Sequence, residues 1–371
     1  MGKYFDIHRT RVTNPIDKNE IDRILSDHLD GTKKAEFYNR NLSGLSVRGR
    51  LDRASFVLCN LRGADFARSS LRGAAFDAAY LGSVDFDSCD LSNSSFVDAD
   101  LRGANLDRAD IHGADFSGAG LAKANFKNRD MRSNNFKGSS FEQVNFRGAD
   151  MPGMDLRDTT FSDCDMMGAN LRGADLSGVV FEDVDLRNAD LDGAILHGAI
   201  FRNVDLDNAR LGSAILDGAS MANVRLRGAK MQGASVRRAE LENVIFADAD
   251  VRTADFRFTT LSHSNMERAD MLGANLSESK VIACDLEAAR LDSADLSNSE
   301  IRGANLKDVH GWDTAIKDGI HTYDVRNVPG EPKPEAKRIK IKLDIQQNAL
   351  NDMVESKQGN SGQALPDNVL E

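Results

Sequence analysis

The stretch LRGADFARSSLRGAAFDAAYLGSVDF (61–86) decides the fold, because every fifth residue in it is Leu or Phe. The same five-residue period continues from Leu51 to Leu306 without a change of register and places Leu, Phe, Met, Ile or Val at 52 positions. The residue two before each of them is small in 49 of the 52 repeats. A period of five fits neither an α-helix nor a flat strand. The backbone must therefore turn a corner every five residues, with two of each five pointing inward and three outward.

Four runs carry a recognisable motif: LRGADF (61–66), LRGANL (101–106), LRGADL (171–176) and IRGANL (301–306). They closely resemble the A(D/N)LXX repeat of pentapeptide-repeat proteins. The resemblance implies an all-β fold, a right-handed quadrilateral parallel β-helix with four repeats in each coil. The 52 repeats then predict about 13 coils.

The repeats suggest three parts in the chain. Residues 1–36 are expected to form an N-terminal cap with one short helix, which has Ile21, Ile24, Leu25 and Leu29 on one side and is ended by Gly31. Residues 37–316 are expected to form the β-helix. Residues 317–371 read as a Pro-containing linker, a short strand and a polar tail.

A second pattern lies in the last part of the chain. Ile339, Ile341, Leu343 and Ile345 alternate with polar residues, which is typical of a strand. This strand is expected either to fold back on the solenoid or to pair with a second copy across a twofold axis, giving a homodimer.

The composition and the cysteines indicate the cellular compartment that the protein occupies. The net charge is −11, no apolar run is long enough to span a membrane, and the first residues lack a secretory pattern, so we expect a cytoplasmic protein. All four cysteines (Cys59, Cys89, Cys164 and Cys284) fall in the small inward column, and no two are 20 residues apart. They are expected to pack as small apolar residues rather than to form disulfides or bind a metal.

Two sets of phenylalanines share a face at intervals of 20 residues. They are Phe56, Phe76, Phe96, Phe116 and Phe136, and Phe141, Phe161, Phe181 and Phe201. Each set is expected to form a stack of rings that holds the coils in register.

Three residues break the small column: Arg129, Asn134 and Met154. A buried charge without a partner is costly, so the backbone is expected to widen there and to let Arg129 reach outward. Two interpretations stay open, a local defect that a long solenoid tolerates and a functional kink or partner notch.

Function must lie on the outward residues, since the fold alone does not define it. Val180, Ile195, Ile200 and Ile215 are outward aliphatics in neighbouring coils and form a candidate interaction surface. Scattered exposed aliphatics are also ordinary, so an interface and an unremarkable surface remain equal alternatives.

A basic stripe shares one outward column: Lys127, Arg147, Arg187 and Arg227. Such a stripe can bind phosphates. The acidic surroundings and the lack of interleaved aromatics argue against direct nucleic-acid binding and favour ion pairs with nearby Asp columns.

The sequence shows no catalytic constellation. Its seven histidines are scattered, and its glycines recur at repeat corners rather than in a phosphate-binding loop. We therefore expect no enzyme activity, no cofactor and no metal. We interpret the chain as a protein-interaction or structural rod, with self-association as one mode of interaction.

The resemblance implies an alternative function. The quinolone-resistance members of the family mimic DNA and modulate a type II topoisomerase, gyrase. This chain departs from them in its basic stripe, its ladder without inserted loops, and its cap and tail. A secreted effector or a virion component is neither supported nor excluded.

Overall fold

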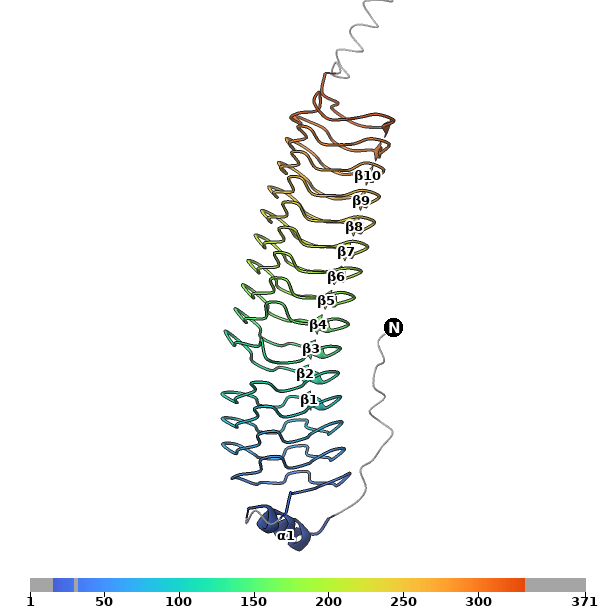
Figure 1. Cartoon of the computed structure of the whole chain (residues 1–371). Helices are drawn as coiled ribbons and strands as arrows, with labels where there is room; N and C mark the ends of the chain where they lie inside the picture. Colours follow the sequence, from blue (N-terminus) through green and yellow to red (C-terminus); the bar gives the residue numbers. More distant parts are fainter. Residues whose placement is uncertain (1–15, 30–32, 331–371) are drawn as a thin grey trace, which may run out of the picture. The chain divides into compact units, whose positions relative to one another are not determined.

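The five-residue beat produces a stack of four-sided coils in the computed structural model, which describes residues 16–29 and 33–330 (Figure 1). Parallel bridges join residues 20 apart in four columns, one on each side of a coil. We name the sides after the first apolar residue of each: the Leu51, Phe56, Leu61 and Phe66 faces.

On the Leu61 face the bridges form one parallel sheet of twelve strands in sequence order. The strands are β1 (Asp100–Arg102), β2 (Gly120–Ala122), β3 (Ser140–Glu142), β4 (Thr160–Ser162), β5 (Val180–Glu182), β6 (Ile200–Arg202), β7 (Ser220–Ala222), β8 (Glu240–Glu242), β9 (Thr260–Ser262), β10 (Lys280–Ile282), β11 (Glu300–Arg302) and β12 (His321–Tyr323). Isolated bridges continue the column toward the N-terminus through Tyr80, Asn60 and Asn41. The predicted parallel β-helix is confirmed.

The core is a narrow line along the axis of the coils. All 52 residues of the fivefold series are buried, and none is more than 5% exposed. Phe56 and Phe76 stack with ring centroids 5.1 Å apart, and Phe161 and Phe181 at 5.2 Å. The predicted ring stacks are confirmed, and they bury large apolar areas while fixing the register of the coils.

The cysteines also lie where expected. All four are free and buried. Burial raises the pKa of the Cys164 thiol to about 11. These thiols are therefore protonated core groups and poor nucleophiles.

One helix precedes the coils, α1 (Lys18–Leu29). Asp17 starts it, because its carboxylate accepts the backbone N–H of Glu20 at 2.8 Å. Leu25 is buried, whereas Leu29, the last residue of the helix, is 58% exposed.

Both ends of the stack adjust their coil length. The first coil is one residue short, with Glu36 bridging Ser55, and the last is one residue long, with Asp295 bridging Ile316. The extra residue is absorbed near Gly311, whose φ is +71°. As a result β12 still pairs with β11, beyond residue 316, where we expected the repeats to end.

By its internal contacts the chain divides into two units, Met1–Arg326 and Asn327–Glu371. The strand expected at Ile339, Ile341, Leu343 and Ile345 falls outside the described residues. No helix in the described part of the chain has the length and apolar character that crossing a bilayer requires.

Candidate functional site

The outward Asp and Asn residues support the corners of the coils. The side-chain oxygen of each typically accepts the backbone N–H two residues later, as Asp65 does from Ala67 at 2.9 Å. This is the turn that Asp and Asn form most readily. A large share of the acidic surface is therefore part of the fold, which the sequence analysis did not foresee.

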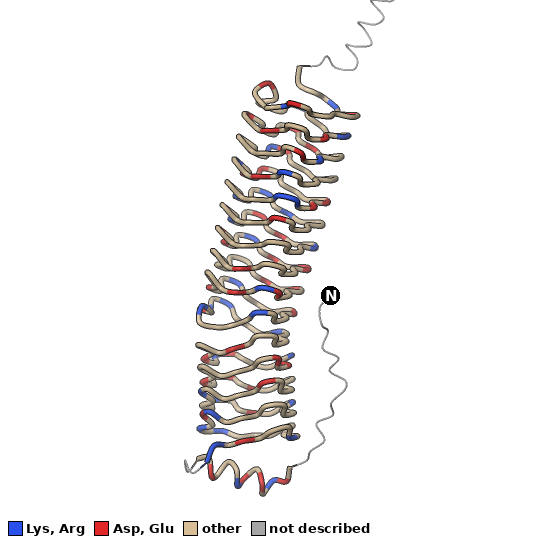
Figure 2. Tube along the Cα trace, turned by 45° about the vertical axis from the view of Figure 1, so that its right-hand side comes forward, with Lys and Arg blue, Asp and Glu red and all other residues tan. Residues whose placement is uncertain are grey.

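Arginine side chains form ion pairs with many of these surface carboxylates. Figure 2 shows Lys and Arg interleaved with Asp and Glu along the coils. Arg157 binds Asp155 through two nitrogens and lies 3.5 Å from Asp175 in the next coil. The hydrogen bond from Arg157 lowers the pKa of Asp155 to about 2.

The structure stacks the four aliphatics of the candidate interaction surface, which we call the apolar patch (Val180, Ile195, Ile200 and Ile215). Val180 pairs with Ile200 on the Leu61 face, and Ile195 bridges Ile215 on the Phe56 face. Ile195 and Ile215 are 37% and 39% exposed, while Val180 and Ile200 are half-buried. The two pairs lie on neighbouring faces and share one corner.

That corner carries little side-chain bulk. It is occupied in successive coils by Gly178, Gly198 and Gly218. A Cβ added at Gly198 or Gly218 would meet nothing within 4 Å. Because the corner residues are glycines, no side chain at the corner stands between the Val180–Ile200 pair and the Ile195–Ile215 pair.

The four residues of the basic stripe share one outward column but differ in their partners. Arg187 binds Asp185 at 2.6 Å and lies 3.5 Å from Asp205. Arg147 lies 3.9 Å from Asp165. The pKa of Asp248 is lowered, chiefly by a hydrogen bond from Arg268 and to a lesser degree by Arg227. Among the described residues Lys127 has no ionic partner.

Lys127 lies at an irregular contact between two coils, which we call the open junction (residues 104–113 against residues 124–133). Bridges are absent here, among the described residues, on the Phe66 and Leu51 faces. They persist on the other two faces, between Asp115 and Asn135 and between β1 and β2. Figure 1 shows these two coils spread apart on the side away from the strands.

The missing bridges leave backbone donors without backbone acceptors. One coil earlier the Phe86 N–H donates to Asn105 at 2.8 Å, and one coil later the Phe126 N–H donates to Asn145 at 2.7 Å. The equivalent N–H of Leu106 has no such partner among the described residues. The same holds for the N–H groups of Arg108 and Asn125.

Side chains replace the lost backbone bonds. The Arg129 guanidinium donates to the carbonyl oxygens of Ala109 at 3.0 Å and Leu106 at 2.9 Å. The Asn134 amide donates in the same way to Ile111 and Ala114. The expected widening is found, but the expectation that Arg129 reaches outward is wrong, because these carbonyls draw it into the gap.

Size explains why the coils separate at this point. Ser139 and Thr259 occupy the same inward column and also donate to a carbonyl 23 residues earlier, at 2.7 and 2.6 Å. Their short side chains reach it at normal coil spacing. A guanidinium on its longer stem does not fit between two coils in contact, so the junction opens.

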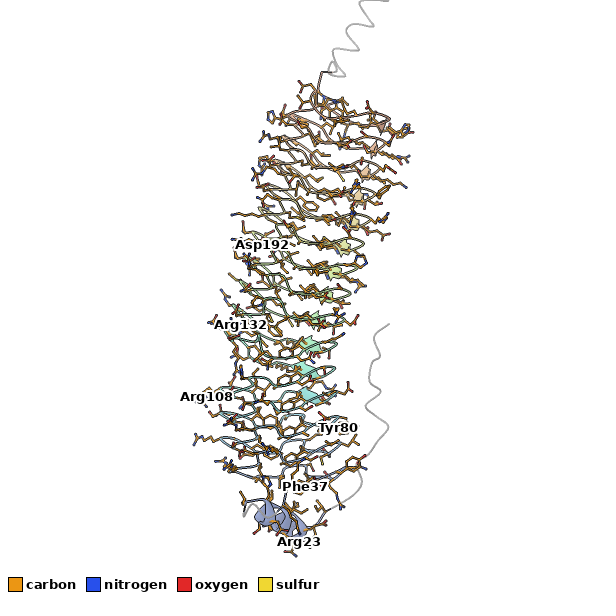
Figure 3. All side chains as sticks on the ribbon, in the orientation of Figure 1. Arg23, Phe37, Tyr80, Arg108, Arg132 and Asp192 are labelled. Atoms are coloured by element: carbon orange, nitrogen blue, oxygen red, sulfur yellow. The ribbon has the colours of Figure 1, made fainter. Side chains whose placement is uncertain are left out.

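The open junction forms a shallow hollow of about 400 Å³ lined by Asp107, Arg108, Asn125, Lys127 and Arg129. Arg108 is held by two hydrogen bonds to Asp87. Arg129 is half-buried, and burial lowers the pKa of its guanidinium. In Figure 3 Arg108 lies on the same side of the coils as Arg132 and Asp192, away from Tyr80.

Ser133 closes the far side of the open junction. Its hydroxyl accepts the N–H of Gly113 at 3.0 Å and lies 2.9 Å from Nδ1 of His112. All three residues are on the surface of the coils rather than in a dry cleft. No group of three or more potential metal ligands occurs among the described residues.

Two groups of exposed apolar side chains were not predicted from the sequence. Tyr38 is 66% exposed, with Leu58 one coil later. Phe258 is 45% exposed and stacks under the guanidinium of Arg238 at 5.4 Å. Both Leu58 and Phe258 sit at corners with positive φ, where short polar residues or Gly are usual. That departure from the corner pattern was the signal available in the sequence.

The fold and the outward chemistry define a class: a parallel β-solenoid of five-residue repeats that acts as a repeat scaffold. A family model described as a pentapeptide repeat region matches residues 134–211. A second, described as pentapeptide repeats in eight copies, matches residues 54–93, 85–121, 94–132, 205–243, 237–271 and 269–308. The chain belongs to the pentapeptide-repeat family.

Solved structures of the same family resemble parts of the chain. Full-length QnrB1, a plasmid-mediated fluoroquinolone resistance protein, is 18% identical with a TM-score of 0.42, over 60% of this chain and 99% of that chain. HetL, involved in heterocyst differentiation in the cyanobacterium Nostoc, is 21% identical with a TM-score of 0.21, over 82% and 94%.

A third structure is a pentapeptide repeat protein from the thylakoid lumen of Arabidopsis thaliana. It is 39% identical with a TM-score of 0.25, over 27% of this chain and 69% of that chain. Comparison with curated proteins gives no match.

Proposed function

We propose that this protein is a non-enzymatic interaction rod that binds a protein surface through the apolar patch. The observation that carries the proposal is the presence of Ile195 and Ile215 at positions where Asp supports the corner. In the same column, one coil earlier, Asp175 accepts the N–H of Ser177 at 3.1 Å. Isoleucine gives up that bond and exposes more than a third of its side chain.

The geometry of the patch supports binding of a protein surface rather than catalysis. Four aliphatic side chains meet around a corner of glycines, so a partner can approach both faces closely. Contiguous exposed apolar patches with polar surroundings often mark protein interaction sites. The partner is accordingly a protein with an apolar surface, either another chain or a second copy of this one.

The test replaces Ile195 and Ile215 by Asp, together and singly. Since Asp is the usual residue at this corner, the free energy of unfolding should stay level or rise slightly, by up to about 1 kcal/mol. Binding of the partner should be lost because two carboxylates would be buried. Self-association is measured by sedimentation velocity, and binding of other proteins by comparing what wild-type and variant chains retain.

The matched control is Ile245→Asp. Ile245 occupies the same position of its repeat on the Phe66 face, between Arg225 and Asn265 in its column, away from the patch. The Ile245→Asp substitution should leave self-association and partner binding unchanged. A wild-type protein that stays monomeric and retains the same proteins as the double variant would exclude the patch as an interface.

A second interface rests on the residues beyond 330. Pairing of Ile339, Ile341, Leu343 and Ile345 with a second copy stays a prediction. Deletion of residues 331–371 combined with the patch substitutions separates the two routes to a homodimer.

The DNA-mimic alternative rests on the net charge of −11 and on the family resemblance. Against it, the acidic side chains are tied into corners and paired with arginines, for example Asp185 with Arg187. A gyrase supercoiling assay with and without a quinolone decides the matter, since a mimic must alter the reaction. The cytoplasmic setting that gyrase requires is likewise a proposal.

A further inference from the structure

We propose that the open junction binds a doubly charged oxyanion, such as a phosphoryl group, between Lys127 and Arg129. The site lies at the corner where the Phe66 and Leu51 faces meet. It is formed by two coils that stack normally elsewhere. The inference is independent of the apolar patch, which lies on the other two faces.

The hollow at the open junction carries an excess of positive charge. The hollow is lined by three cations and one carboxylate, Asp107, on a chain that is acidic as a whole. Arg108 is already neutralised by Asp87. Within residues 16–29 and 33–330, Lys127 and Arg129 remain as cations without a carboxylate in ion-pair contact.

Among the described residues Arg129 has no carboxylate in direct contact. Its guanidinium is half-buried, donates hydrogen bonds to neutral carbonyl groups and lies over the Phe126 ring, while Asp107 and Asp110 act on it at longer range. A cation removed from water is stabilised strongly when an anion joins it. An incoming oxyanion would supply that charge and still leave the carbonyl bonds intact.

The open junction also presents backbone N–H groups without backbone acceptors among the described residues. In the described part of the chain, the N–H groups of Leu106 and Arg108 on one coil and of Asn125 on the next have no ladder partners. Backbone N–H groups beside cations bind the oxygens of phosphate and similar anions. A tetrahedral anion has enough oxygens to accept from both coils and from Lys127 at once, which a single carboxylate does not.

Another hollow, around Arg210 and Lys230, lacks these features. It measures about 560 Å³ and contains Arg210 and Lys230 beside Asp192. Its ladder is intact, because Lys230 donates to Ala209 at 2.9 Å and accepts from Leu211 at 2.7 Å. It offers exposed charge without free backbone donors, and therefore provides the control.

The experiment titrates the full chain with inorganic phosphate at constant ionic strength and follows backbone amide resonances. Those of Leu106, Arg108 and Asn125 should shift in a saturable way, while those of Leu211 and Ser213 should not. Lys127→Ala should weaken binding by about fivefold, and Lys127→Glu should abolish it, since a charge-assisted hydrogen bond is lost or reversed. Lys127 is exposed, so neither change affects folding.

Lys230→Ala is the matched control, because it removes the same charge from an exposed lysine outside the open junction. It should leave the affinity for phosphate within about twofold, as expected when only screened long-range charge changes. A parallel titration with phosphoserine distinguishes the sources: tighter binding than inorganic phosphate indicates a phosphorylated ligand, and equal binding indicates the free ion. Unsaturable shifts, or equal weakening by Lys127→Ala and Lys230→Ala, would overturn the proposal.

Discussion

At the scale of single residues, Gly311 in the last coil occupies a position that a residue with a Cβ cannot take without moving the backbone. A Cβ added at Gly311 would lie 2.3 Å from the backbone nitrogen of Asp292, and φ is +71°. The close approach follows from the extra residue in the last coil. Most corner glycines lack such a contact, as Gly168 shows with φ +67° and nothing within 4 Å.

Gly311→Ala should therefore destabilise the last coil, by about 2 kcal/mol or more, because the backbone must move in addition to adopting a strained φ. Gly168→Ala should cost about 1 kcal/mol from the φ alone. The two variants are compared by urea unfolding and by hydrogen exchange of β12. Equal losses for both variants would mean that the last coil has room to adjust.

At the scale of the structural element, the open junction arises from two residues at the small inward position of consecutive repeats. Arg129 and Asn134 stand where Ala109 and Ala114 stand one coil earlier, and both donate to carbonyls of that coil. The Asn134 Oδ1 is buried without a hydrogen-bond partner. The junction is thus held open by groups that are costly to bury.

Replacing both Arg129 and Asn134 by Ala should let the coils close and restore the backbone ladder. We expect the free energy of unfolding to rise by about 1–3 kcal/mol, because buried polar groups are removed and ladder bonds return. Phosphate binding should disappear in the same variant. Urea unfolding and the amide resonances of Leu106 and Asn125 report the two effects.

Ser139→Ala is the control for this change. Ser139 donates to the carbonyl of Phe116 across the same pair of coils at normal spacing. Its loss should destabilise the protein by about 1 kcal/mol. A destabilised double variant would show that Met154 and the neighbouring coils, rather than Arg129 and Asn134, set the spacing.

At the scale of the whole molecule, stability should depend on acid through the repeated Asp–Arg pairs. The hydrogen bond from Arg132 lowers the pKa of Asp130 to about 2, and that from Arg157 does the same for Asp155. The folded pKa is below the unfolded value of 3.8, so the native state binds fewer protons in this window. The stabilisation is fully present above about pH 5 and is lost progressively as the pH falls through 3.8 toward 2.

The urea midpoint should accordingly change little between neutral pH and pH 5 and then decline steeply below pH 4. Each exposed pair contributes little, but the pairs recur in successive coils and their effects add in a repeat protein. Arg132→Gln and Arg157→Gln together should make the decline shallower. A midpoint that falls equally with and without these arginines would assign acid sensitivity to other groups.

The fivefold spacing determined the solenoid and the inward column, because an unbroken period fixes which side chains face the axis. The ring stacks also required four repeats per coil, a number that the family resemblance supplied. It also located the apolar patch and the irregular segment. The bonding at the open junction was decided only by the tertiary structure. Whether Arg129 turns outward or inward depends on the carbonyls of Leu106 and Ala109, and only the stacking of coils brings those groups, 20 or more residues away, beside it.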